Sequence, residues 1–112
     1  MMENFLDQAE RTLYEKVLAR DEYVMKSFHM TNAWKFFMES VEKNEKVVSC
    51  VLDIEPKGDW FKVTQLMLDD DGMPVYANEK SYVGRVIKAK ELDDDVKAFM
   101  KGEHRQVMRK PY

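Results

Sequence analysis

The hydrophobic period of the chain changes near residue 46, and this change limits what the sequence can fold into. Before it, apolar residues recur at steps of three, four or seven, which places them on one face of a helix. After it, β-branched residues gather in runs of about eight that alternate between two faces. Helices followed by hairpins are typical of an α+β domain.

The helical part predicts two N-terminal helices. We expect the first over residues 4–27, with Asn4 as its N-cap and one apolar face made of Leu6, Ala9, Leu13, Val17, Val24 and Phe28. We expect the second to begin near Thr31 or Asn32, either of which can cap a helix, and to end at Asn44. Because no glycine or proline separates the two, one long bent helix is the alternative.

The remainder predicts an antiparallel sheet of three or four strands, then a C-terminal helix. The expected strands are residues 47–54, 60–68, 73–76 and 81–88. Pro56 and Gly58 indicate a tight turn between the first two strands, which therefore form a hairpin. Asp93 is a suitable N-cap for the last helix and Gly102 a suitable end. We expect the helices to cover one face of the sheet.

The whole chain, residues 1–112, is expected to form a single domain, with residues 103–112 as a loosely ordered basic tail. No apolar run approaches the roughly 20 residues that a membrane span requires. The acidic N-terminus is unlike a secretory signal, and the lone Cys50 cannot form an internal disulfide. These features predict a soluble, cytoplasmic protein.

The residues that could carry catalysis or bind a metal show none of the required spacing. Cys50 lies within an apolar predicted strand, which is typical of a structural cysteine. His29 and His104 have no partner at metal-ligand spacing. Asp69–Asp71 precede Gly72 but lack the remaining positions of a calcium loop, and so indicate a turn. We therefore expect no catalytic residues, no metal and no cofactor.

A surplus of apolar side chains on the second helix favours a protein-interaction domain. Trp34, Phe36, Phe37 and Met38 offer more apolar surface than one helix face needs for the core. Methionine and aromatic residues are also frequent at binding surfaces. The predicted partner is another protein, which the domain regulates or inhibits, or a second copy of the chain.

Two alternatives remain open. Bases and aromatic side chains in the predicted strands favour single-stranded nucleic acid, bound by stacking and phosphate contacts through Trp60, Lys62, Tyr82, Arg85 and Lys88. The net charge of −3 weighs against this alternative. The other is a small enzyme or ligand carrier with a pocket between sheet and helices, which only the fold can reveal.

Overall fold

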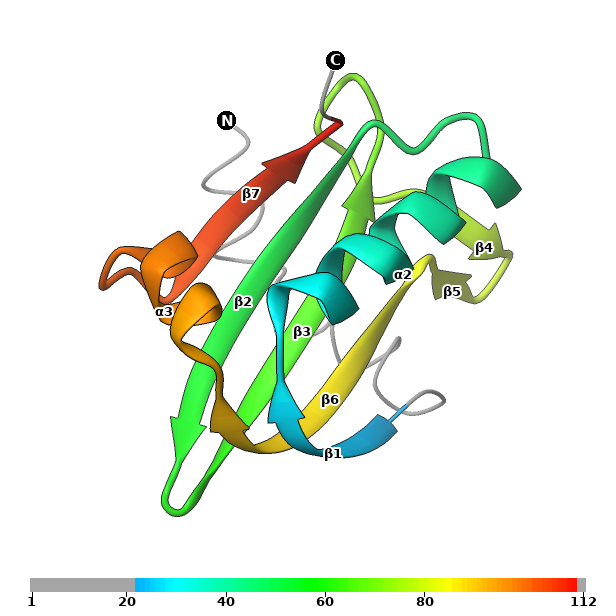
Figure 1. The fold of residues 1–112 in the computed structure, drawn as a ribbon. Coiled ribbons are helices and arrows are strands. Elements are labelled where there is room, and N and C mark those ends of the chain that lie inside the picture. Colours follow the sequence, from blue (N-terminus) through cyan, green and yellow to red (C-terminus); the bar gives the residue numbers. More distant parts are fainter. Residues whose placement is uncertain (1–21, 111–112) are drawn as a thin grey trace.

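The computed structural model describes residues 22–110. Within this range, seven strands and two helices form a five-stranded sheet, a separate two-stranded ribbon and their connections (Figure 1). In chain order the elements are β1 (Glu22–Phe28), α2 (Met30–Lys43), β2 (Ser49–Lys57), β3 (Trp60–Leu68), β4 (Tyr76–Asn78), β5 (Ser81–Tyr82), β6 (Gly84–Leu92), α3 (Asp94–Met100) and β7 (Arg105–Arg109).

The five-stranded sheet has the order β1-β6-β3-β2-β7 and is mixed. The pairs β6–β3, β3–β2 and β2–β7 are antiparallel, whereas β1 runs parallel to β6. Strands β4 and β5 pair only with each other and form the small ribbon. As the sequence indicates, β2 and β3 form a hairpin closed by Gly58 and Asp59, and Gly58 has the positive φ of 68° that this tight turn requires.

The expected pair of N-terminal helices is wrong within the described range. Residues 22–27, which we assigned to the end of the first helix, belong to β1, and residues 4–21 of that expectation lie outside the described residues. Val24 and Phe28 are four apart and fit one face of a helix, but in β1 Phe28 is fully buried whereas Val24 is 77% exposed. The parallel pairing with β6 decides between helix and strand, and it joins segments about sixty residues apart. One long bent helix is wrong for the same reason.

The expected sheet and helical layer are also wrong. The sheet has five strands and a parallel pair, instead of three or four antiparallel strands. The described helices do not form a layer over one face. Helix α2 crosses the sheet, and the seven-residue α3 lies near the β7 edge, where it connects β6 to β7 (Figure 1). Local period predicts the elements, whereas sheet order depends on long-range pairing that period does not report.

The C-terminal basic segment, expected as a loose tail, contains the edge strand β7. Residues 105–109 pair with β2 in the register Cys50 to Met108, and Met108 is buried. The polar residues that suggested a tail include Arg105 and Arg109, which share one face of β7 while Met108 points to the other. The alternation of polar and apolar residues that indicates a strand extends over only five residues here. The polar, basic composition of the segment therefore favoured a tail from the sequence alone.

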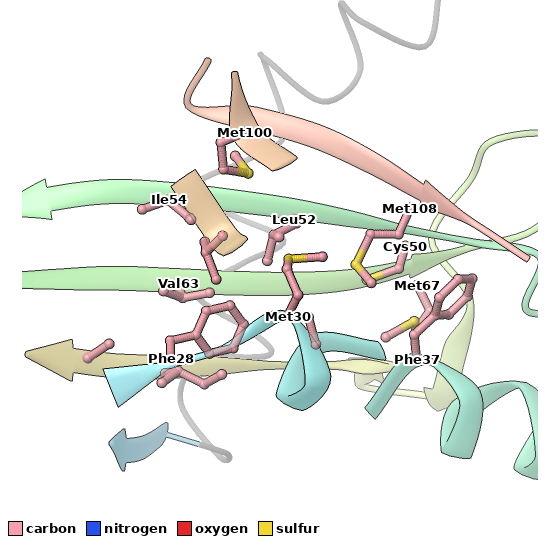
Figure 2. Close-up of a cluster of buried hydrophobic side chains, with 14 of the residues drawn as sticks. Phe28, Met30, Phe37, Cys50, Leu52, Ile54, Val63, Met67, Met100 and Met108 are labelled. Carbon is pink, nitrogen blue, oxygen red and sulfur yellow. The ribbon is translucent and has the colours of Figure 1, made fainter. Parts of the chain in front are cut away.

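The main core lies where α2 and α3 meet the sheet. Phe28, Met30 and Phe37 pack against alternate residues of the strands, including Cys50, Leu52, Ile54, Val63, Met67 and Met108 (Figure 2). Because these strand residues alternate along the chain, their side chains lie on the face of the sheet that α2 and α3 contact. Side chains of the other face are buried as well, among them Val51, Leu66, Leu68 and Val86.

Among residues 22–110, neither helix is long and apolar enough to cross a membrane.

Candidate functional site

A buried polar network fixes α2 to the sheet. The Gln65 side chain, which is fully buried in β3, donates from Nε2 to the backbone carbonyl of Ala33 over 3.1 Å. Its Oε1 accepts from Nε of Arg85 over 2.8 Å, and Arg85 also donates from Nη2 to the backbone carbonyl of Asn32 over 2.9 Å. The side chains of Gln65 in β3 and Arg85 in β6 therefore hydrogen-bond the first turn of α2.

The same network positions Phe36. The guanidinium carbon of Arg85 lies 4.2 Å from the centroid of the Phe36 ring, which is a cation–π geometry. One residue corresponds to about 100° of helix rotation, so Phe36 lies on the flank of α2 next to the fully buried Phe37. This flank faces the β4–β5 ribbon, which lies beside the C-terminal half of α2 (Figure 1).

Between α2 and the ribbon is a groove of about 500 Å³, which we call the helix–ribbon groove. Its volume falls within the usual range of ligand pockets, about 300–1,000 Å³. Apolar and aromatic side chains lie beside hydroxyl, amide and oppositely charged groups along its walls. The residues that line it are Phe36, Glu39, Ser40, Lys43, Asn44, Ala77, Asn78, Ser81, Tyr82, Val83 and Gly84.

The ribbon wall is held by its own contacts. Oδ1 of Asn78 accepts hydrogen bonds from the backbone N–H groups of Lys80 and Ser81, which closes the turn between β4 and β5. The Tyr82 hydroxyl donates to the Tyr76 hydroxyl over 3.2 Å, and the two ring centroids lie 4.6 Å apart. This hydrogen bond raises the pKa of Tyr82 to about 12, so the phenol remains neutral at physiological pH.

The four residues predicted to bind a protein partner do not form one surface. Phe37 is fully buried and belongs to the core, and its ring centroid lies 5.8 Å from that of Trp34. Trp34, Phe36 and Met38 are partly buried against the core. Phe36 and Met38 are two residues apart and therefore lie on opposite flanks of Phe37. Of the four, Phe36 alone lines the helix–ribbon groove.

The five residues predicted to bind nucleic acid separate into two groups. Trp60, Lys62 and Lys88 lie together on the sheet, because Lys62 is opposite Lys88 and the Lys88 Nζ lies 4.7 Å from the centroid of the Trp60 ring. Arg85 is buried beneath α2, and Tyr82 lies in the ribbon. The structure therefore brings together three of the five.

The single cysteine is buried in the core. Cys50 is 0% exposed, and burial raises the pKa of its thiol to about 12. The thiol is therefore protonated at neutral pH, the form that is a poor nucleophile. Its Sγ lies 3.7 Å from Nε2 of Gln65, so it also borders the buried polar network.

The two histidines each contact an aspartate. Nδ1 of His29 lies 3.4 Å from the Asp93 carboxylate, and the Asp95 carboxylate accepts from the backbone N–H of Met30. His29, Asp93 and Asp95 offer ligand atoms within 4.8 Å of one another, yet the contacts serve to join the starts of α2 and α3.

Asp69, the first residue of the Asp69–Asp71 run, accepts hydrogen bonds from backbone N–H groups within its own turn.

A third polar cluster lies on the opposite face of the sheet from the main core. Asp53 has a side chain that is 8% exposed, and its Oδ1 lies 3.2 Å from Nδ1 of His104 and 3.5 Å from Nε of Arg105. Burial raises the pKa of Asp53, although the contact with His104 acts in the other direction. The cluster ties β7 to β2.

Sequence reasoning missed most of the groove, which Glu39, Lys43, Ala77, Asn78 and Ser81 help to line. We assigned residues 81–88 to one strand, but they belong to both β5 and β6. Asn78 was an available signal, because asparagine favours turns by bonding backbone N–H groups ahead of it. It indicates the turn between β4 and β5, but it does not indicate the break between β5 and β6 that separates the ribbon from the sheet.

No protein-family model, no curated protein and no solved structure significantly matches this chain.

Proposed function

We propose that the chain is a protein-interaction domain that binds a short, extended segment of a partner protein in the helix–ribbon groove. The observation that carries this proposal is the composition of the groove walls. Phe36, Ala77 and Val83 supply apolar contacts. The Oδ1 atoms of Asn44 and Asn78 accept backbone N–H groups, but each side-chain amide also carries an N–H₂ group of the kind that donates to a peptide carbonyl. An apolar centre with a polar rim is the usual anatomy of a protein interface.

The charges of the groove favour a peptide over a polyanion. Glu39 and Lys43 lie one helical turn apart on the same wall of α2, so the wall is electrically balanced. A phosphate backbone would meet the Glu39 carboxylate, whereas a neutral peptide with mixed side chains would not be repelled. The anchored Phe36 ring is already held in place, which limits the entropy lost on binding.

The test is selection of random dodecapeptides displayed on phage against the full chain, followed by affinity measurements on the enriched peptides. We expect enriched peptides with micromolar affinity. Ala77→Trp fills the groove from an exposed position of β4 and should weaken binding by at least about tenfold, since the anchor site is lost. Ala98→Trp, exposed on α3, is the matched control and should bind as the unmodified chain does.

Equal affinity of the Ala77→Trp and Ala98→Trp variants would contradict the proposal, as would failure to enrich any peptide above background. Light scattering of the full chain at increasing concentration addresses a second copy as the occupant. A dimer that Ala77→Trp dissociates would assign the groove to self-association instead of a different partner.

A further inference from the structure

A second surface lies at the hairpin end of the five-stranded sheet. Lys62, Lys88 and Lys90 lie on the same face of the sheet as Trp60 there, and we call these four residues the basic strip. Lys62 and Lys88 are opposite each other in neighbouring strands, and Lys90 follows two residues along β6, on the same face. Lys88 and Lys90 are exposed, while Trp60 and Lys62 are partly so.

The basic strip is on the face of the sheet opposite the main core. Val63, Ile87 and Ala89 alternate with the strip residues along β3 and β6, and all three are buried in the core cluster. Because successive strand residues point to opposite faces, the lysines point away from α2. The strip is thus spatially distinct from the helix–ribbon groove.

The basic strip concentrates positive charge locally, although Glu55 and Asp53 lie on the same face of the sheet. The whole chain has a net charge of −3, yet the strip holds three lysines. Glu55 lies opposite Lys62, but its carboxylate also lies 3.3 Å from Nζ of Lys57, so this acid is shared between two bases. Like charges placed directly opposite each other, as Lys62 and Lys88 are, destabilise a sheet. An anion bound between them would relieve that repulsion.

Trp60 adds an aromatic surface to the charge. The Lys88 ammonium lies over the ring, 4.7 Å from its centroid, and the side chain of Lys88 is long enough to move to a bound phosphate. Val24, which is paired with Lys88 in register, is 77% exposed and supplies apolar surface next to Lys88. A stacking ring bordered by lysines is the arrangement that binds unpaired bases together with their phosphates.

We propose that the basic strip binds single-stranded nucleic acid, with a base stacked on Trp60 and phosphates on Lys62, Lys88 and Lys90. The stacking surface favours an unpaired base over duplex, because bases inside a helix do not expose their faces. This activity goes beyond the binding of a protein segment in the groove and uses none of the groove residues.

The test is fluorescence anisotropy of labelled oligo-dT and oligo-U dodecamers with the full chain at 50 and 200 mM salt. Three phosphate contacts predict a log–log salt slope near −2, and therefore a loss of affinity of roughly twentyfold between the two conditions. Lys88→Gln should reduce the slope by about 0.7. Trp60→Ala should weaken binding between about fivefold and about a hundredfold, whereas Trp60→Tyr should retain most of it.

Four variants separate binding at the strip from a general effect of charge, from a loss of folding and from binding in the groove. Lys35→Gln and Lys97→Gln each neutralise an exposed helical lysine outside the strip and should leave affinity unchanged. Lys62→Gln removes both the repulsion with Lys88 and the attraction to Glu55, so it should weaken binding while the urea midpoint stays level. Ala77→Trp should bind the oligonucleotides normally, which distinguishes this surface from the groove.

Three results would overturn the proposal. The first is the absence of oligonucleotide binding at 50 mM salt. The second is binding that Lys88→Gln and Trp60→Ala leave unaltered. The third is equal affinity for duplex DNA or for anionic phosphatidylserine vesicles, which would identify a general attraction to negative charge instead of recognition of a single strand.

Discussion

At the scale of single residues, the groove depends on a side chain that does not line it. Arg85 contacts the Asn32 carbonyl, Gln65 and the Phe36 ring at once, and it thereby sets both the position of α2 and the orientation of its groove-facing ring. Gln65 completes the connection to Ala33. A buried network of this kind stabilises a fold only while every member is satisfied.

Replacement of either network member should therefore destabilise the protein. Gln65→Leu removes the hydrogen-bond partner of the Ala33 carbonyl and that of the Arg85 Nε. Arg85→Leu removes the side-chain partner of the Gln65 Oε1 and that of the Asn32 carbonyl. We expect each variant to lower the free energy of unfolding by about 2–3 kcal/mol. The double variant should cost less than the sum, because both changes break the same bond.

Urea denaturation of the four proteins measures this coupling. A coupling energy of about 1 kcal/mol or more is expected. Strictly additive losses would show that Gln65 and Arg85 act independently, and the network account of α2 would then fail.

Asp53 predicts a pH dependence of stability. Burial raises its pKa, so the folded protein holds the proton more tightly than the unfolded chain does. Stability should consequently fall as pH rises from the ordinary aspartate pKa, about 3.9, through the raised value. Asp53→Asn removes the titrating group and should flatten the profile in that window, which thermal unfolding at successive pH values would detect.

Asp59→Asn, in the exposed hairpin turn, is the matched control and should keep the profile of the unmodified chain. An unchanged slope in Asp53→Asn would indicate that its contacts with His104 and Arg105 fully offset the cost of burial.

At the scale of elements, close approach of strands limits one position of β6. A Cβ at Gly84 would clash with the backbone carbonyl oxygen of Gln65, so Gly84→Ala forces β3 and β6 apart where the network begins. We expect a loss of about 2–3 kcal/mol in the free energy of unfolding, in the range of overpacked sites. Gly58→Ala meets no atom within 4 Å and has only an unfavourable φ of 68°, so about 1 kcal/mol is expected.

Chemical denaturation of both glycine variants checks this order. If Gly58→Ala proved the more damaging substitution, the close packing of β6 on β3 would be contradicted.

Elements fixed by local chemistry were predictable from the sequence. Pro56 and Gly58 indicated the β2–β3 hairpin, and Asn44 and Asp93 marked the end of α2 and the start of α3. The strands β1 and β7 were not, because each is defined by pairing with a distant strand. The N-cap of α2 is His29, and Asn32 acts instead from inside the first turn by accepting from the His29 N–H.

The same distinction applies to the candidate sites. Strand alternation predicts that Trp60 and Lys62 share one face of β3, but only the pairing of β3 with β6 brings Lys88 opposite Lys62. Alternation along β6 also places Arg85 on the face opposite Lys88, whereas its burial follows from the position of α2 over β6, which alternation does not predict. The groove required the ribbon to lie beside the helix, and nothing in the local sequence specifies that contact.

At the scale of the whole molecule, the two proposed surfaces lie on different parts of the fold. The groove lies between α2 and the ribbon, whereas the basic strip occupies the opposite face of the sheet near the β2–β3 hairpin. No residue belongs to both. Each surface can therefore be disabled without the other, and one domain could hold a protein segment and a nucleic acid at the same time.

The most direct test of the proposed function is an amide ¹H–¹⁵N NMR titration of the full chain with a peptide enriched on phage. We predict that the largest shifts fall on groove residues of α2 and the ribbon, such as Lys43, Ala77 and Gly84, with Lys62 and Lys88 unperturbed. Shifts centred on the basic strip, or scattered over the surface without a focus on the groove, would contradict the account.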